Sequence, residues 1–174
     1  MRLFIISGKS GTGKNKLAKM IAKYYDTKGE KSIITEYSKY VKVMAREALN
    51  WDGSRATKPR KFLQDMGQVF RETLGYDVFI KRMQEDIMVY EKYYNNIIIS
   101  DARLKGELTL MKEKYPNCYT IHLTSNIENN LTTDEKNHIT ETELDNFNLI
   151  DYQLDSSDLN KLKREIENIL EVIK

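Results

Sequence analysis

The sequence is poor in residues that cross-link or interrupt a chain, with one cysteine and two prolines among 174 residues. The lone Cys118 excludes an internal disulfide and a zinc site built from cysteines. No apolar run approaches the roughly 20 residues that cross a bilayer. The apolar stretch after Met1 is also shorter than the roughly 7–15-residue core of a signal peptide. We therefore expect a cytoplasmic protein that does not act on a membrane.

An excess of charge of one sign is also lacking. The 28 basic and 26 acidic residues leave a formal net charge of +2. No basic stripe with interleaved aromatic residues stands out, which argues against a nucleic-acid partner but not against small anionic substrates. The length and the 40% of hydrophobic residues suit a single domain, 1–174, with a core of its own.

Short apolar runs alternate with longer amphipathic stretches. Strands are predicted over 3–6, 32–36, 96–100, 119–123 and 151–154. Helices are predicted from Lys14, over 105–115, over 159–173 and through most of 38–92, with breaks near 51–54 and at Gly75. We expect a polar loop at 125–137, and Ser156 or Ser157 as the cap of the last helix. This alternation predicts a three-layer α/β fold, a mostly parallel sheet with helices on both faces.

A glycine-rich turn follows the first predicted strand and satisfies the phosphate-loop pattern G-x-x-x-x-G-K. Its residues are Gly8, Lys9, Ser10, Gly11, Thr12, Gly13, Lys14 and Asn15. Glycines let backbone N–H groups turn toward phosphate oxygens, and the lysine ammonium bridges the terminal phosphates. Asn15 stands where Ser or Thr usually faces magnesium, although its amide oxygen can face the metal or a metal-bound water. The alternative interpretation is a flexible glycine turn.

Asp101 closes the strand predicted at 96–100. A carboxylate at the carboxyl end of a parallel strand faces the ligand crevice, where phosphate-loop enzymes place the acid that holds magnesium. Arg103, two residues on, is predicted on the same side. The alternative is an acid that caps a helix, followed by a surface arginine.

Gln64 and Arg71 are seven residues apart, so they share one face of a predicted helix. An arginine can fork onto a phosphate, and a glutamine amide can contact a base edge. The same spacing also suits a solvated polar face, which is the alternative.

Four segments, in this order, resemble bacteriophage deoxynucleoside monophosphate kinases of the P-loop nucleoside monophosphate kinase group. More distantly they resemble animal-type phosphomevalonate kinases. Residues 10–15 are similar to the family's phosphate loop, in which an aspartate often follows the lysine, and 61–77 are similar to its L-L-Q-x-L-G, arginine and G-x-D run. Residues 98–107 are similar to I-x-D-x-R-F-x-x-E, and 138–144 to H-x-S-E-x-E-L.

The resemblance implies ATP-dependent phosphoryl transfer, with Mg²⁺, to a deoxynucleoside monophosphate, giving the diphosphate. It implies a helical acceptor-binding insertion at about 38–92, a short lid loop at about 125–140, and a homodimer as an option. The resemblance implies that Lys14 contacts the transferring group and that Asp101 holds magnesium together with Asn15, directly or through water. It implies that Arg103 stabilises charge on the group in flight, and that the acceptor is bound by Arg71, Gln64 and Asp77.

The sequence has no arginine between Arg103 and Arg164, so the predicted lid offers only Lys136, with His138 just beyond as a predicted capping or positioning residue. Two alternatives therefore stay open. One is a related kinase with a phosphomevalonate-type acceptor, whose extra cations would be Arg46, Arg55, Lys58 and Arg60. The other is a nucleotide-binding regulator without turnover.

Overall fold

The computed structural model describes residues 1–54, 56–126 and 132–173. The described residues form a five-stranded sheet in the order β2-β3-β1-β4-β5, and all four strand pairings are parallel. Its strands are β1 (Arg2–Ser7), β2 (Ser32–Thr35), β3 (Asn96–Ala102), β4 (Cys118–Thr124) and β5 (Tyr152–Asp155). The five strands predicted from apolar runs are confirmed, and the central position of β1 puts the glycine-rich turn at the middle of one sheet edge.

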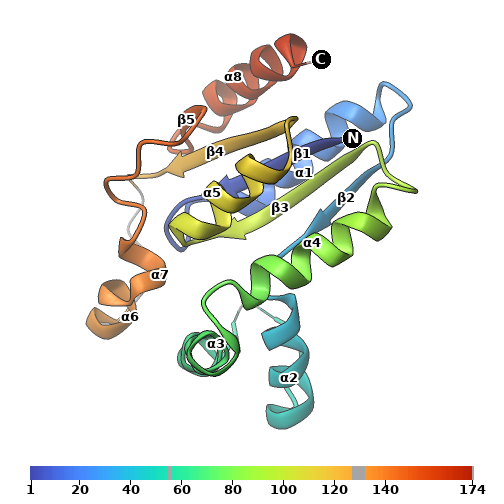
Figure 1. The fold of residues 1–174 in the computed structure, drawn as a ribbon. Helices are drawn as coiled ribbons and strands as arrows, with labels where there is room; N and C mark the ends of the chain where they lie inside the picture. The colour runs from blue at the N-terminus through green and yellow to red at the C-terminus, as the bar shows by residue number, and fades with distance from the viewer. Residues whose placement is uncertain (55, 127–131, 174) are drawn as a thin grey trace.

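Helices cover both faces of this sheet, so the predicted three-layer arrangement is confirmed (Figure 1). The helices are α1 (Lys14–Asp26), α2 (Lys39–Leu49), α3 (Arg60–Leu74), α4 (Val78–Tyr90), α5 (Lys105–Lys114), α6 (Thr133–Asn137), α7 (Ile139–Thr142) and α8 (Leu159–Val172). The helices α1 and α8 pack on one face, and α4 and α5 on the other. None of the helices in the described ranges combines the length and apolar character needed to cross a membrane.

Successive side chains of a strand point to opposite faces of the sheet, so the core consists of two clusters, one on each face. Leu3 and Ile5 of β1 pack with Met83 of α4 in one cluster. Phe4 and Ile6 pack with residues of α1 and α8 in the other. Both faces of the central strand are therefore buried, which explains why its sequence is a continuous apolar run without alternation.

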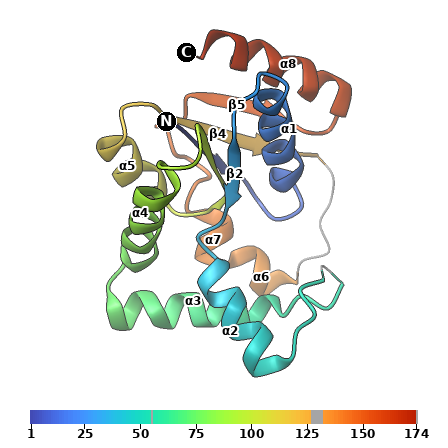
Figure 2. The same ribbon diagram turned by 90° about the vertical axis from the view of Figure 1, so that its right-hand side faces the viewer.

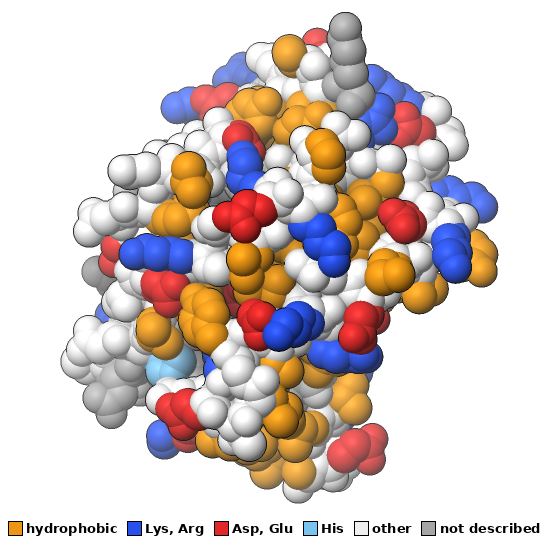
Figure 3. All heavy atoms as spheres, in the orientation of Figure 1, with side chains coloured by type: hydrophobic (Ala, Val, Ile, Leu, Met, Phe, Trp, Pro, Cys, Tyr) orange, Lys and Arg blue, Asp and Glu red, His pale blue; other side chains and the backbone are white. Residues whose placement is uncertain are grey.

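The carboxyl ends of the strands meet a second group of helices. Figure 2 shows α2, α3, α6 and α7 gathered beyond that edge, away from the two helical layers. Ligands in open α/β sheets bind at this edge, so these four helices surround the place where a site is expected. On the face that carries α4 and α5, acidic, basic and hydrophobic side chains are interspersed (Figure 3).

Two local predictions are wrong. The segment 125–137 is not wholly a loop, because α6 begins at Thr133 and makes its own backbone hydrogen bonds, such as that from the Lys136 N–H to the Thr132 carbonyl. The predicted lid at 125–140 therefore includes a short helix and the start of α7, while its residues 127–131 lie outside the described residues, as does Arg55.

The cap of α8 is also not a serine. The Asp158 carboxylate accepts hydrogen bonds from the N–H groups of Asn160 and Lys161. Asp158 directly precedes the first helical residue, which is the position that a capping side chain must occupy. Ser156 and Ser157 lie too early, and their hydroxyls donate instead to the Thr124 carbonyl and the Asp155 carboxylate.

Candidate active site

The glycine-rich turn after β1 has the geometry that its sequence predicts. Gly8, Gly11 and Gly13 have φ values of 135°, 87° and 87°, a region that side chains other than glycine rarely adopt. A Cβ atom on Gly8 would lie 2.3 Å from the carbonyl oxygen of Leu123, at the end of β4. The turn is thus packed directly against the neighbouring strand, and it delivers Lys14 as the first residue of α1.

Lys14 lies inside this turn. Its Nζ donates to the carbonyl oxygens of Gly8 and Lys9, at 2.7 Å each, and the side chain is buried. Burial lowers the pKa of Lys14 well below its usual value, and nearby Arg103 lowers it further, whereas Glu141 and Asp101 raise it. An anion bound in the turn would favour the charged ammonium in the same way as these carboxylates do.

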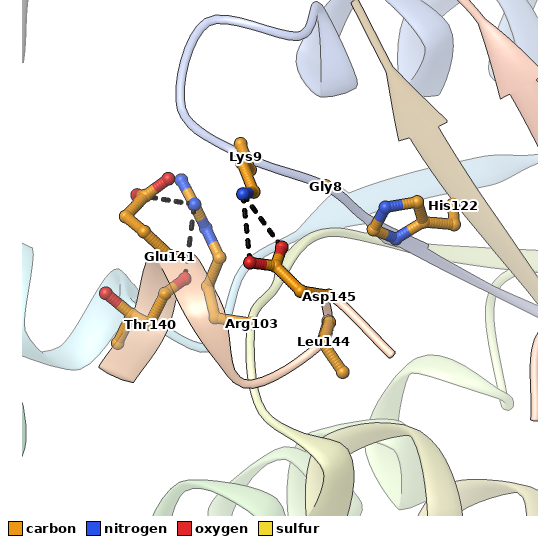
Figure 4. A pocket seen from close by; sticks show the side chains of 8 residues that line it. All are labelled: Gly8, Lys9, Arg103, His122, Thr140, Glu141, Leu144 and Asp145. Carbon is orange, nitrogen blue, oxygen red and sulfur yellow. Dashed lines mark hydrogen bonds and ion pairs between the residues drawn. The ribbon is translucent and has the colours of Figure 1, made fainter. Parts of the chain in front are cut away.

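Glu141 of α7 bridges the turn and Arg103. Its Oε2 accepts from the Ser10 N–H at 2.8 Å. Its Oε1 accepts from Arg103 Nη1 at 2.6 Å (Figure 4). A second carboxylate, that of Asp145, pairs with Lys9 at 2.8 Å. These contacts close the space between α7 and the turn to a pocket of about 10 Å³, room for about one water molecule.

Sequence reasoning assigns no role to Glu141 or Asp145. Each is more than 130 residues from its partner in the turn, as Glu141 and Ser10 are 131 apart and Asp145 and Lys9 are 136 apart. The resemblance placed Glu141 in a matching segment, which was the only signal that could have found it.

Asp101 organises the start of α2. Its Oδ1 accepts from the Tyr37 N–H at 2.7 Å, and its Oδ2 from the Ser38 N–H at 3.0 Å. Asp101 therefore fixes the backbone just before α2, and it does not cap α5, the helix that follows it, whose preceding residue is Leu104.

The residues at this edge fit a magnesium ion of the kind that phosphate-transfer sites use. Mg²⁺ is usually held there by one or two carboxylates, substrate phosphates and waters, not by a cage of protein ligands. Each oxygen of Asp101 keeps a lone pair after its one hydrogen bond, and Asn15 is exposed at the start of α1. Among the described residues, no group of three acidic, histidine or cysteine side chains could hold a metal by itself.

Arg71 is held by a buried carboxylate. Its Nη2 lies 3.8 Å from Glu107 Oε1, and its guanidinium lies over the Phe79 ring, 5.1 Å from the centroid. Glu107 also accepts hydrogen bonds from the N–H groups of Arg103, at 2.6 Å, and Leu104, at 3.0 Å. Burial nevertheless raises the pKa of Glu107 to about 7, so this carboxyl neutralises Arg71 only in part at neutral pH.

The predicted site residues do not all come together. Lys14, Asp101 and Arg103 are electrostatic neighbours, and Glu107 links Arg71 to the backbone beside Arg103. Gln64 is half-buried on α3, on the same helix as Arg71. Asp77 directly precedes α4 and pairs with Lys81 of that helix at 2.9 Å.

His138 is a capping residue, as predicted. It directly precedes α7, and its Nδ1 accepts from the Thr140 N–H at 3.3 Å. Burial and the nearby Arg71 lower the pKa of His138, which keeps the imidazole neutral and able to accept. The cap thus fixes the start of the helix that carries Glu141.

The fold and the glycine-rich turn together define a P-loop kinase fold. The chain is similar to a shikimate kinase from Bacteroides thetaiotaomicron, with 16% identity, a TM-score of 0.54, and coverage of 98% of this chain and 99% of that one. It is similar to a sugar kinase from Janibacter sp. HTCC2649, with 13% identity, a TM-score of 0.55, and coverage of 99% and 95%. A shikimate kinase from Aquifex aeolicus gives 15% identity, a TM-score of 0.50, and coverage of 98% and 96%.

These identities show the fold alone. No protein-family model matches the sequence, and no curated protein matches it. The resemblance to deoxynucleoside monophosphate kinases therefore stays a prediction.

The close packing of Gly8 can be tested against a second glycine. Gly8→Ala would place a Cβ atom on the Leu123 carbonyl, whereas at Gly29, with φ of 75°, an added Cβ meets nothing within 4 Å. Gly29→Ala should therefore cost only the backbone strain of about 1–2 kcal/mol. Gly8→Ala should cost more in chemical denaturation, because the added Cβ atom also clashes with the Leu123 carbonyl. Equal costs for the two substitutions would contradict this packing.

Glu107 should leave a signature in the pH dependence of stability. Its folded pKa, about 7, lies above the usual 4.5, so the folded state binds the proton more tightly. This stabilisation is complete below about pH 4.5 and is lost as pH rises through about 7, by roughly 3 kcal/mol at most. Glu107→Gln keeps an oxygen for the two N–H donors, so its free energy of unfolding should lack this fall between pH 4.5 and 7.

The control for this experiment is Glu113→Gln, an exposed glutamate on the same helix. Its unfolding curve should keep the wild-type pH dependence. A Glu107→Gln curve parallel to that of the wild type would show that the buried carboxyl is ionised throughout this range.

Proposed function

We propose that the protein is an ATP-dependent kinase whose acceptor is a deoxynucleoside monophosphate. The observation that carries this proposal is the convergence of Lys14, Asp101 and Arg103 at the carboxyl edge of the sheet, beside a glycine-rich turn shaped for phosphate. The fold supports the class of reaction, and the four matching segments support the choice of acceptor.

The transfer needs positioned charge more than covalent chemistry. The bond from the γ-phosphorus of ATP to its bridging oxygen breaks, and a bond to an oxygen of the acceptor phosphate forms, which leaves ADP and a nucleoside diphosphate. That acceptor oxygen is already anionic, so no residue has to remove a proton. The N–H groups of the turn and Lys14 would bind the ATP phosphates.

Magnesium would be held by Asp101 and by Asn15, directly or through water, and would neutralise charge on the ATP phosphates. Arg103 would stabilise charge on the group in flight. In this structure its guanidinium pairs with Glu141 at 2.6 Å, so Glu141 fixes the direction in which Arg103 points.

Arg71 and Gln64 would bind the acceptor from α3. The guanidinium of Arg71 can fork onto the acceptor phosphate, and its charge is available because the pKa of Glu107, about 7, leaves this partner partly protonated. Gln64 would contact the base or the sugar.

The test is ADP release from Mg·ATP with each of the four deoxynucleoside monophosphates added separately. Phosphomevalonate, shikimate and a reaction without acceptor run in parallel, since the fold is shared by kinases of other small molecules. Stimulation by a deoxynucleotide supports the proposal. ADP release stimulated only by phosphomevalonate or shikimate would show that the proposed acceptor is wrong and would identify another. ATP binding without stimulation by any acceptor would favour a nucleotide-binding regulator.

In the same assay Arg71→Ala should raise the KM for the acceptor by about tenfold or more, because the variant loses a hydrogen bond between two charged groups. The KM for ATP should stay within about twofold. Arg164→Ala is the matched control, because Arg164 is exposed on α8, on the far side of the sheet. Equal changes in both KM values for Arg71→Ala would contradict the assignment of this arginine to the acceptor.

A further inference from the structure

Positive charge reaches the glycine-rich turn from the start of α3 and the residues just before it. Arg60, the first residue of α3, donates from Nη1 to the Ser10 hydroxyl at 3.2 Å. The two residues are 50 apart in sequence, so this contact brings a separate element to the tip of the turn.

Lys58 adds a second cation two residues before Arg60, and its carbonyl oxygen accepts from the Arg60 N–H at 2.9 Å. Burial and the neighbouring Lys42, Arg60 and Arg103 lower the pKa of Lys58 to about 8, and Asp101 opposes them. Lys58 also acts on Lys14, whose pKa it helps to lower. Lys58 is thus electrostatically coupled to four other cations, Lys14, Lys42, Arg60 and Arg103, and such a cluster favours a bound anion.

These cations differ in how far the protein already neutralises them. Arg103 pairs with Glu141 at 2.6 Å, and Lys42 pairs with Glu36. Among the side chains that the structure describes, no carboxylate lies within ion-pair distance of Lys58 or Arg60. Their charge is thus the part of the cluster most available to a ligand.

The position of Arg60 indicates which ligand group it meets. The helix that it begins also carries Gln64, about one turn on, and Arg71, about three turns on, the two residues assigned above to the acceptor. The other end of the contact is the turn that would hold the ATP phosphates. Arg60 therefore lies at the junction of the donor and acceptor sites, which the transferred group has to cross.

We propose that Arg60 and Lys58 bind the γ-phosphate of ATP during its transfer, in place of the arginines of a lid. The inference rests on the proposed function and adds two catalytic residues to it. The planar fork of Arg60 can hold two phosphate oxygens, and Lys58 supplies a point charge beside it. This assignment accounts for a sequence with no arginine between Arg103 and Arg164, because the cations come from the other side of the site.

The test compares two nucleotides that differ in the γ-phosphate. Isothermal titration with Mg²⁺ gives the dissociation constants of ADP and of a non-hydrolysable ATP analogue for each variant. Arg60→Ala should weaken the ATP analogue about tenfold or more and ADP less than about twofold, and Arg60→Lys should recover part of the loss. Lys58→Met should likewise raise the ratio of the dissociation constant of the ATP analogue to that of ADP.

Lys61→Ala is the matched control. It removes the same charge one residue further on, but the Lys61 side chain is 86% exposed and pairs with Asp65 at 3.0 Å. Its ratio of the two dissociation constants should equal that of the wild type. Thermal unfolding of each variant confirms that the chain is folded.

Three results would overturn the inference. Arg60→Ala could weaken the binding of both nucleotides equally, or it could weaken the binding of neither. Lys61→Ala could also weaken the ATP analogue as much as Arg60→Ala does, which would show that the loss of affinity reflects net charge alone. If the wild type bound neither nucleotide, the proposed function itself would fail, and this inference with it. If the nucleotides bound as expected and only the ratio stayed constant, the proposed function would stand without these two residues.

Discussion

The close contact between the turn after β1 and the end of β4 determines the arrangement of the site. At Gly8 there is no room for a side chain, because a Cβ atom would lie 2.3 Å from the Leu123 carbonyl. This contact fixes where the turn leaves the sheet, and hence where α1 begins. Lys14 can then fold back onto the carbonyls of Gly8 and Lys9 only because those carbonyls are held in place.

Carboxylates then tie the surrounding helices to this fixed point. Asp101 holds the backbone at the start of α2, Glu107 holds Arg71 of α3, and Glu141 holds both Ser10 and Arg103 from α7. Each of the three accepts at least one backbone N–H group and also faces a cation, so carboxylates and cations alternate around the site. Such a network keeps arginines in defined directions, as catalysis by positioned charge requires.

Much of the fold could be predicted from local patterns. The continuous apolar run of β1 and the helical spacing after Lys14 are properties of neighbouring residues, and both are confirmed. The same holds for the glycine-rich turn, whose dihedral angles follow from its composition. The predicted serine cap of α8 is wrong although the helix begins at residue 159 as predicted, because Asp158, which directly precedes that start, also carries a capping side chain.

The long-range contacts of the site had no local signature. Ser10 meets Glu141 across 131 residues and Arg60 across 50, and nothing in either neighbourhood specifies the other. The sequence alone suggests Arg60 only as one of four cations that would bind an alternative, phosphomevalonate-type acceptor. The structure indicates a different role for Arg60, because the start of α3 lies against the glycine-rich turn.

The most direct test of the central claim is the dissociation constant of Mg·ATP for the wild type and for Lys14→Met. The methionine keeps most of the buried stem and removes the ammonium. Lys16→Met, at an exposed position two residues further along α1, is the control. We predict that Lys14→Met weakens ATP about 10- to 100-fold at an unchanged melting temperature and that Lys16→Met does not. Equal affinity in all three proteins would show that ATP does not bind in this turn.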